Sequence, residues 1–347
     1  MERKLMTVGI ILLFVGVCCI SVNALPIQNS LLSLPRVNWL YVGGDGPGNY
    51  STIPEAIDNA SEGDTVYVYA GTYKNVTIDK PLQLLGEDKH TTIINGTGSH
   101  NAVYVDANAV NISGFTIQNR DTLAGKGICI QDRRNNIMVT DTILTHTYVG
   151  IIFWWNTNIL LYNITFSAND EGICFQFGKN CTIIDCIFTH NGAGINAGYS
   201  PYTTGASFVI KDNLFLHNSV GLDIYECIDT LGNTTIEGNS FQQNYYGITI
   251  DSCRGVGITK NNFINNTRQV VLSRNSYVRE IPGLLPYRQH WRNNFWDDWN
   301  LNLRYVIHGH WTLYVGADLE TFTICRFPIK EYDPAPAHEP YNIGENR

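Results

Sequence analysis

The sequence predicts an all-β chain wound as a single-stranded right-handed parallel β-helix, a solenoid of rungs of about 22 residues. Three observations predict this fold. A bulky apolar residue recurs with a glycine six positions later, an alternating strand follows each glycine, and an asparagine recurs at one turn of the rungs. Two or three short strands in about 22 residues leave no room for a helical repeat, whereas one turn of a parallel β-helix has this length.

Five pairs of markers define the repeat: Leu144/Gly150, Phe166/Gly172, Phe188/Gly194, Phe215/Gly221 and Phe241/Gly247. Both series step by 22, 22, 27 and 26 residues, so the two longer steps place insertions outside the marker interval. We expect stacked parallel rungs over Asp64–Thr267, with the bulky markers and Phe263 in one interior column. Gly127 extends the series upstream, and we expect the repeat to stop at Gln269, where the glycine is lost.

Each glycine opens an alternating strand, in which residues one and three positions later are expected to point inward. A second inward ladder lies seven residues before each bulky marker: Ile137, Ile159, Cys181, Phe208, Thr234 and Val256. Three residues after the marker stand Thr147, Asn169, Asn191, Asn218, Asn244 and Asn266. Asparagine tolerates the left-handed backbone of a sharp turn, and its amide can bond to the next rung. We therefore predict a structural asparagine ladder.

Residues 1–24 are typical of a secretory signal peptide. A basic start at Arg3 and Lys4 precedes an apolar run over Leu5–Ile20 and a small-residue cleavage site ending at Ala24. An uncleaved membrane anchor is the alternative, because the apolar run is only slightly short of a span. Either reading places the folded part in a secreted, cell-surface or periplasm-like location, with no transmembrane span after signal removal.

Three further segments follow the signal. Residues 41–73 are expected to form an N-terminal cap and the first strands, with a capping box over Thr52–Glu55 opening a short helix. Residues 74–272 are the predicted parallel β-helix. Residues 273–347 are a C-terminal capping region and tail, in which we expect a distal plug of Trp291, Phe295, Trp296, Trp299 and Trp311.

The charge balance argues against nucleic acid as a partner. Removing Glu2, Arg3 and Lys4 with the signal leaves 30 acidic and 21 basic residues, a net charge of −9. Polarity comes mainly from neutral hydrogen-bonding side chains, which suit hydroxyl-rich ligands. Nine glycosylation sequons fit an exported glycoprotein, although many arise by chance in an asparagine-rich chain: Asn49, Asn59, Asn75, Asn95, Asn111, Asn163, Asn180, Asn233 and Asn265.

Several segments carry a resemblance to a known family. The stretch "YSTIPEAIDNASEGDTVYVYAGTYKNVTIDKPLQLLGED", the Gly-Ile repeats, "NNFWDDW" and "DPAPAHEPYNI" together resemble archaeal exported right-handed β-helix proteins. These are grouped with the periplasmic copper-binding (NosD-type) β-helix family, within the pectate-lyase-like superfold. The resemblance covers nearly all of the mature chain and implies the fold, while the family spans proteins of no single activity.

The opening stretch also resembles pectin methylesterases, but the residues speak against esterase activity. Arg120 stands before Asp121 where that family has Gln, and its Asp-Phe-Ile-Phe-Gly segment is absent. The Asp-Pro-His-Glu motif of alginate epimerases is missing too. The "HGHW" segment at His308–Trp311 lacks the Gly-His-Gly order of polygalacturonases.

An outward column four residues after each glycine predicts a ligand-binding face. It holds Gln131, Trp154, Gln176, Gly198, Tyr225 and Asp251, and the next column includes Trp155, Tyr199 and Glu226. Insertions over 199–206 and 228–233 are expected to rise beside it. Rings beside amides and carboxylates suit a polysaccharide or cell-envelope glycan, and we assign its binding to Trp154, Trp155, Gln176, Tyr199, Tyr202 and Tyr225. A protein partner at the surface is the alternative.

The same face offers candidates for catalysis as a polysaccharide lyase or glycoside hydrolase: Asp223, Asp251, Glu226 and Arg254. One rung and two residues separate Asp223 from Asp251, which places their backbones about 8 Å apart and overlaps the carboxyl separation of inverting glycosidases. An outward position on an open sheet favours ordinary ionised acids unless loops bury them. Binding without turnover is therefore the preferred hypothesis.

No cofactor is firmly implied, and calcium and copper stay open. His190 and His217 occupy equivalent positions on consecutive rungs and are expected to stack, as a copper pair or as polar turn residues. Gln243 and Ala168 flank them, so no third ligand is evident and we expect at most weak copper binding. His308 and His310 are a second weak pair.

Cys227 and Cys253 each lie six residues after a marker glycine. Register places them side by side on adjacent rungs, within the separation that a disulfide tolerates. We therefore predict a bond between them in the exported protein.

Overall fold

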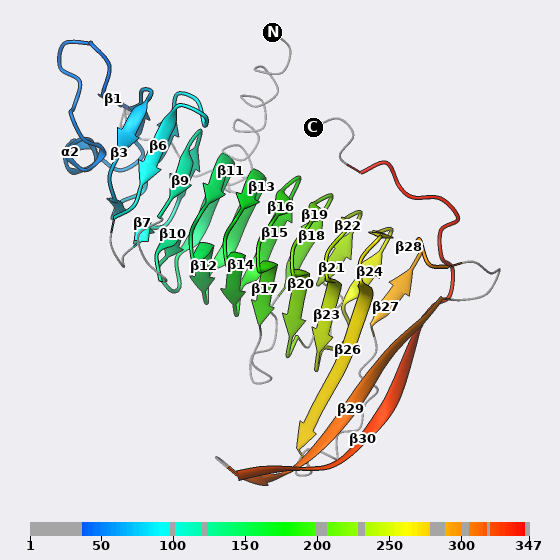
Figure 1. The fold of residues 1–347 in the computed structure, drawn as a ribbon. Coiled ribbons are helices and arrows are strands. Elements are labelled where there is room, and N and C mark those ends of the chain that lie inside the picture. Colours follow the sequence, from blue (N-terminus) through cyan, green and yellow to red (C-terminus); the bar gives the residue numbers. More distant parts are fainter. Residues whose placement is uncertain are drawn as a thin grey trace, which may run out of the picture. The chain divides into compact units, whose positions relative to one another are not determined.

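A computed structural model describes residues 37–97, 101–119, 124–198, 207–227, 233–277, 289–299, 305–317 and 320–343. All of them belong to one compact unit, Val37–Arg347. The unit is a parallel β-solenoid of about nine turns with rungs of about 23 residues, visible in Figure 1 as a stepped stack of strands. The predicted all-β solenoid is confirmed. Over these ranges no helix is long and apolar enough to cross a membrane.

The strands stack in three columns, which we call the first, second and third faces. The first face consists of β1 (Trp39–Val42), β2 (Thr65–Val68), β5 (Gln83–Gly86), β8 (Val110–Ser113), the first halves of β11 (Asn135–Thr145) and β13 (Thr157–Ser167), then β15 (Lys179–Ile184), β18 (Phe208–Lys211), β21 (Thr235–Glu237), β24 (Gly257–Thr259) and β27 (His290–Arg292).

The second face runs beside it and shares β11 and β13, whose 11 residues each extend over both faces. Its other strands are β3 (Gly71–Tyr73), β6 (Thr92–Asn95), β9 (Thr116–Gln118), β16 (Ile187–Thr189), β19 (Leu214–Leu216), β22 (Ser240–Gln242), β25 (Asn262–Ile264) and β28 (Phe295–Trp296).

The third face is a separate 11-stranded sheet that includes every marker-glycine strand. Its members are β4 (Val76–Ile78), β7 (Asn101–Val105), β10 (Lys126–Ile130), β12 (Val149–Trp154), β14 (Glu171–Gln176), β17 (Ala193–Gly198), β20 (Val220–Tyr225), β23 (Tyr246–Asp251), β26 (Arg268–Tyr277), β29 (Tyr305–Ala317) and β30 (Glu320–Asp333). All pairings are parallel except the last, β29 with β30.

The bulky markers form the interior column that the sequence predicts. Phe166, Phe188, Phe215, Phe241 and Phe263 are fully buried, and consecutive rings stack with centroids 4.7–5.1 Å apart. The second predicted ladder, from Ile137 to Val256, is buried on the first face. Parallel stacking of like residues therefore builds the core.

The marker glycines are required by close approach between rungs. A Cβ added at Gly172 would lie 2.5 Å from the carbonyl oxygen of Gly194 and 3.0 Å from the ring of Phe188. The same pair of contacts recurs at Gly150, Gly194 and Gly221. The glycine thus leaves room for the aromatic column and for the next backbone.

The asparagine ladder is confirmed, with one correction. Each amide joins the next rung: Asn191 donates from its backbone N and its Nδ2 to Asn218 Oδ1, both at 3.0 Å. The left-handed backbone, however, lies one residue earlier than we expected, at His146, Ala168, His190, His217, Gln243 and Asn265. The asparagine acts through its hydrogen bonds, while its predecessor adopts the strained conformation.

A second asparagine ladder, not anticipated from the sequence, follows the first face. Its fully buried members are Asn213, Asn239, Asn261 and Asn294. Within the ladder, the backbone N and the Nδ2 of each asparagine both donate to the Oδ1 of the asparagine on the next rung. The ladder ends on the buried carboxylate of Asp333, which accepts from Asn294 N and Nδ2 at 3.0 Å.

The expectation that the repeat stops at Gln269 is wrong. β27 and β28 add a further rung on the first and second faces, and Trp296 takes the marker position opposite Phe263. The Trp296 ring stacks on Phe263 at 4.3 Å and on Tyr305 at 4.1 Å. Only the series of marker glycines ends at Gln269. On the third face, β26 is followed by β29.

At the other end, helix α2 (Ile53–Asn59) packs its apolar side into the core. Thr52 and Glu55 form the predicted capping box, and Ile53, Ala56 and Ile57 are buried. In Figure 1 the helix lies at the blue end of the stack, next to the first strands.

Candidate functional site

The outer side of the third face forms a continuous row that contains the residues two positions after each marker glycine and their register partners on the flanking strands. Register aligns Thr77, Tyr104, Cys129, Ile152, Cys174, Asn196, Asp223, Thr249 and Val271. Beside it, Trp154, Gln176, Gly198, Tyr225 and Asp251 align in the column predicted from the sequence. The Asp223 and Asp251 candidates are thus two residues and one rung apart, as expected.

Polar side chains in this row bond across rungs. Glu171 Oε1 accepts from Asn196 Nδ2 at 2.7 Å, and Asp223 accepts a short hydrogen bond from the Thr249 hydroxyl. The Asn196 Oδ1 is buried and has no hydrogen-bond partner among the residues that the structure describes. A hydroxyl or amide donor of a ligand would satisfy that oxygen.

Tyr225 lies along the sheet and does not project from it. Its hydroxyl accepts from Gln176 Nε2 at 2.9 Å, two rungs away. The ring crosses the intervening Gly198, where an added Cβ would come within 2.4 Å of the tyrosine hydroxyl oxygen. The absence of a side chain at Gly198 therefore leaves room for the ring. Two predicted glycan-binding residues, Gln176 and Tyr225, are hydrogen-bonded to each other.

The carboxyl of Asp223 differs from an ordinary surface acid. Burial raises its pKa, and the negative charges of Asp251 and Glu171 raise it further, against the lowering effect of the Thr249 hydrogen bond. The same surroundings act on a neighbouring thiol, since burial and Glu171 raise the pKa of Cys174 to about 12. The sequence favours an ordinary ionised acid at Asp223 unless its surroundings bury it, and the raised pKa reflects such partial burial.

Two tryptophans at the end of β12 present their rings to solvent. Trp154 and Trp155 are 42% and 44% exposed. Trp155 has a left-handed backbone and stacks on Phe177 of the next rung, with centroids 4.0 Å apart. The pair forms an exposed aromatic edge beside the polar row.

The other candidates lie on turns. Glu226 is exposed and left-handed just after β20, and Arg254 follows β23 with its N–H donating to Cys227 O at 2.7 Å. Tyr199 and Tyr202 fall outside the described residues. The strand face therefore brings Asp223 and Asp251 onto one surface, while Glu226 and Arg254 stand at its margin.

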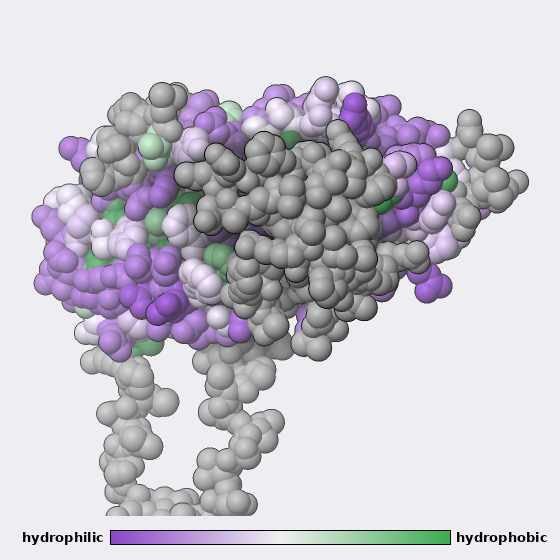
Figure 2. All heavy atoms as spheres, turned by 90° about the horizontal axis from the view of Figure 1, so that it is seen from below, coloured by the Kyte–Doolittle hydropathy of each residue, from purple (hydrophilic) through white to green (hydrophobic). Residues whose placement is uncertain are grey.

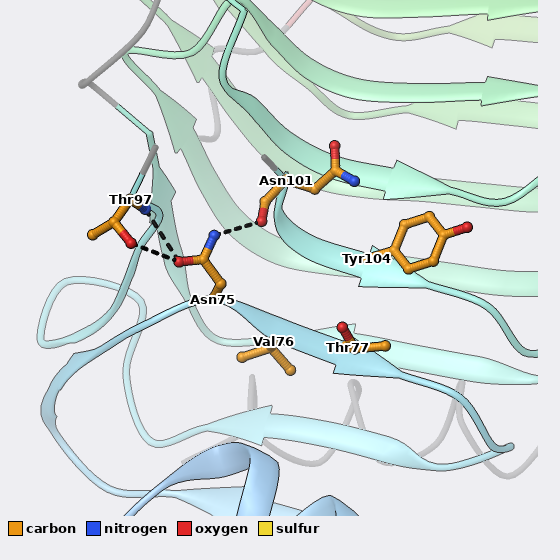
Figure 3. Close-up of a pocket in the computed structure, with 6 residues that line it drawn as sticks. All are labelled: Asn75, Val76, Thr77, Thr97, Asn101 and Tyr104. Carbon is orange, nitrogen blue, oxygen red and sulfur yellow. Dashed lines mark hydrogen bonds between the residues drawn. The ribbon is translucent and has the colours of Figure 1, made fainter. Parts of the chain in front are cut away.

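A shallow hollow of about 460 Å³ opens on the third face near β4 and β7. Figure 3 shows Asn75 between Thr97 and Asn101: its Nδ2 donates to Asn101 O at 2.7 Å and its Oδ1 accepts from Thr97. Tyr104 also lines the hollow, with its hydroxyl bonded to Gln131 Oε1. The lining is uncharged and rich in amide and hydroxyl groups.

The visible surface in Figure 2 is mainly hydrophilic, with hydrophobic residues in small separate patches between the grey atoms. The part of this face that Figure 2 leaves visible therefore offers mostly polar side chains.

The histidine pair lies on adjacent rungs, just after β16 and β19. His190 and His217 are exposed, with ring centroids 5.1 Å apart and planes tilted by 44°. The His190 Nδ1 is hydrogen-bonded to the Thr189 hydroxyl. Within the ranges that the structure covers, no group of three His, Cys, Asp or Glu side chains could hold a metal ion. The histidine pair therefore has no third ligand of these types there, as its sequence neighbours Gln243 and Ala168 indicate.

Cys227 and Cys253 are both buried and adjacent, as the register predicts. The Cys227 N–H donates to Cys253 Sγ at 3.3 Å, and both residues are thiols in this structure. Burial and the neighbouring Cys227 raise the pKa of Cys253 well above its usual value.

A comparison with protein families identifies the chain. The family described as periplasmic copper-binding protein (NosD) matches residues 57–300. This protein belongs to the NosD family. The resemblance seen in the sequence is therefore confirmed, and the match covers every rung of this NosD-family protein from the N-terminal helix to β28. A search of curated proteins finds no match.

Solved structures similar to this NosD-family protein include two enzyme modules. The A-module of mannuronan C-5 epimerase AlgE4 from Azotobacter vinelandii has 14% identity over 64% of this chain and 76% of its own, with a TM-score of 0.52. The AlgE6 A-module of the same organism has 15% identity over 71% and 82%, with a TM-score of 0.50. The pectate lyase Pel9A has 13% identity over 70% and 76%, with a TM-score of 0.44. At such identities the likeness concerns the fold alone.

Sequence reasoning missed Glu171, Asn196 and Thr249. Glu171 directly precedes a marker glycine, and the other two stand two positions after one. Both positions point outward on the third face, so counting from the marker glycines would have identified these three residues.

Proposed function

We propose that this NosD-family protein binds a polysaccharide or cell-envelope glycan on the outer side of the third face, without cleaving it. The observation that carries the proposal is the outward row from Thr77 to Thr249, which carries the hydroxyl, amide and carboxyl groups of Thr77, Tyr104, Asn196, Asp223 and Thr249 and is flanked by the exposed Trp154. Sugar rings present apolar C–H faces and polar edges, so a ring beside hydrogen-bonding groups matches both.

Two further observations support a glycan. The hollow lined by Asn75, Asn101 and Tyr104 lies on the same outer side, at the N-terminal end of the row. The two epimerase modules with the same fold are named for mannuronan, a polysaccharide. A flat polar sheet with a hollow at one end suits a chain lying along the solenoid axis.

A glycan array with the purified protein tests the proposal. We expect Trp154→Ala to abolish binding to any glycan retained by the native protein. Tyr162→Ala is the matched control, because Tyr162 is an exposed aromatic residue on the first face. Equal loss in both variants, or retention by Trp154→Ala, would contradict this location.

A second candidate function is a polysaccharide lyase or glycoside hydrolase on the same face. It is favoured by Asp223, which lies part-buried near Asp251 and Glu171 and whose raised pKa suits a general acid. Analysis of products from any bound polysaccharide decides between the two. Cleavage lost in Asp223→Asn or Asp251→Asn would establish the enzyme.

Copper handling is the least supported alternative, since His190 and His217 lack further ligands nearby in the described chain. Calorimetric titration with copper that finds a tight site lost in His217→Ala would restore it. We also propose that residues 1–24 direct export out of the cytoplasm and that the solenoid winds right-handed, as parallel crossovers generally do.

A further inference from the structure

A cluster of four aromatic side chains lies on the outer side of the first face, at its N-terminal end. Trp39 and Tyr41 come from β1, Tyr67 from β2 and Tyr69 from the residue after it. Neighbouring ring centroids are 5.2–6.4 Å apart: Trp39 to Tyr41 and Tyr67, and Tyr69 to Tyr41 and Tyr67. We call these four residues the aromatic platform.

The platform does not serve the core. Alternation along β1 directs Val42 inward, where it is fully buried, while Trp39 and Tyr41 remain 53% and 39% exposed. Register pairs Tyr41 with Tyr67 on the adjacent strand. Cross-strand aromatic pairs stabilise a sheet modestly, but such stabilisation does not require a tryptophan that is more than half exposed.

Polar groups border the rings. The carboxylate of Glu87 accepts from Ala70 N at 2.9 Å, and it follows β5, the next strand of the first face. Burial and Glu87 raise the pKa of Tyr67, so its hydroxyl stays neutral and can both donate and accept. Register aligns Trp39, Thr65 and Gln83 on the consecutive strands β1, β2 and β5.

The charges around the aromatic platform indicate which kind of ligand it can bind. The exposed Glu87 beside the rings disfavours an anionic lipid surface and an anionic glycan, and the whole chain carries a net charge of −8. Two lysines of the N-terminal rungs are engaged with other groups: Lys89 pairs with Asp141 at 2.7 Å, and Lys80 donates to Ile57 O at 3.0 Å and Ala60 O. Rings with hydroxyl tips and one carboxylate acceptor suit uncharged sugar rings, which offer C–H faces and hydroxyl donors.

We propose that the aromatic platform is a binding site for a neutral polysaccharide, separate from the third face. It lies on a different side of the solenoid and does not rest on the function proposed above. The protein would then hold a neutral glycan at its N-terminal end while the third face stays available for another ligand.

Affinity electrophoresis of the full chain tests this site. The probes are hydroxyethylcellulose, laminarin and galactomannan, three neutral soluble polysaccharides. We expect at least one to retard the native protein, and Trp39→Ala/Tyr41→Ala to weaken that retardation about tenfold or more, the loss expected when two stacking contacts are removed. Tyr162→Ala, an exposed aromatic on the same face, is the matched control and should bind as the native protein does.

A second variant separates binding from folding. Trp39→Leu/Tyr41→Leu keeps apolar bulk on β1 but removes the flat rings, so we expect a native melting temperature and the same loss of retardation. Native affinity in this variant would overturn the proposal, as would the absence of retardation by all three probes.

Third-face variants distinguish the two sites. Retardation lost in Trp154→Ala but kept in the platform variants would overturn the platform and leave the third-face function standing. Binding to phosphatidylcholine vesicles that depends on Trp39, without retardation by a polysaccharide, would assign the platform to a membrane and also overturn the proposal.

Discussion

At the residue scale, the marker glycines show that the spacing repeated along the chain has a steric cause. The interval between bulky residue and glycine could be read from the sequence, but the reason for it could not. Only the structure shows that each glycine faces both the next backbone carbonyl and the ring of the next phenylalanine. The spacing identifies the rung, and packing explains the residue type.

Gly194→Ala should destabilise the protein by about 1–3 kcal/mol, the usual cost of overpacking a core. The added Cβ would lie 2.4 Å from Gly221 O and 2.9 Å from the Phe215 ring. Gly257→Ala is the matched control, because its Cβ would find Thr235 Cγ2 at an ordinary 3.6 Å. Denaturant unfolding measures both, and equal effects would refute the steric account.

Asp223→Asn should raise the melting temperature at neutral pH. The folded-state pKa of Asp223 is raised, so its contribution to stability is present below the unfolded pKa and is lost as the pH rises through the folded value. Asparagine removes the buried charge and still accepts from Thr249. The difference between variant and native melting temperatures should therefore vanish at pH values below about 4. A difference independent of pH would contradict burial of this carboxyl.

The pair Cys227 and Cys253 should be disulfide-bonded once the chain reaches an oxidising compartment. Both thiols are buried on adjacent rungs, and Cys227 N lies 3.3 Å from Cys253 Sγ. Non-reducing peptide mapping of the freshly exported protein decides the point, with Cys181 as an internal control for a buried thiol. Recovery of both cysteines as free thiols would refute the bond.

At the element scale, the asparagine ladders define the turns. The first ladder was predicted because its members share one offset from the bulky markers. The second escaped notice because the residue in its column is Cys186 on one rung and Asn213 on the next. In both ladders a left-handed residue precedes the asparagine, such as His217 before Asn218 and Asp212 before Asn213. These preceding residues share no side-chain type, so the turn is visible in the backbone and not in the sequence.

Asn218→Ala should destabilise the protein by about 1–3 kcal/mol for each buried group left unpaired. Asn218 is 3% exposed, donates to Phe188 O at 2.9 Å and Asn244 Oδ1 at 3.0 Å, and accepts from Asn191. Asn59→Ala is the control, since Asn59 is exposed and its amide donates to Glu55 O at 2.8 Å on the surface. Thermal unfolding compares them, and a similar shift in both would contradict a buried role.

At the scale of the whole molecule, the sequence predicts the stacking of the solenoid well, but it predicts the side-chain contacts on the third face poorly. Repeat spacing is enough to align Asp223 with its neighbours, because parallel register follows directly from the markers. Burial of Asp223, the course of Tyr225 over Gly198 and the bond from Asn196 to Glu171 depend on which side chains bend across rungs. Those choices are made by packing in three dimensions, which periodicity does not encode.

The C-terminal end offers a test of how stability is distributed along the solenoid. Asp333 is fully buried and closes the second ladder, accepting from Asn294 and, at 3.3 Å, from Trp296 Nε1. Because each rung contacts only its neighbours, losing this acceptor should loosen the last rungs first.

Asp333→Ala should therefore speed amide hydrogen exchange in β24, β25, β27 and β28 while leaving β5 and β8 close to native rates. Glu237→Ala is the control, because Glu237 makes an exposed ion pair with Lys260 at 2.7 Å, and such pairs contribute little. Exchange followed by mass spectrometry gives rates for peptides along the chain. A uniform rise from β5 to β28 would mean that the solenoid opens as a single cooperative unit, and that the ladder transmits the loss of its last acceptor through every rung.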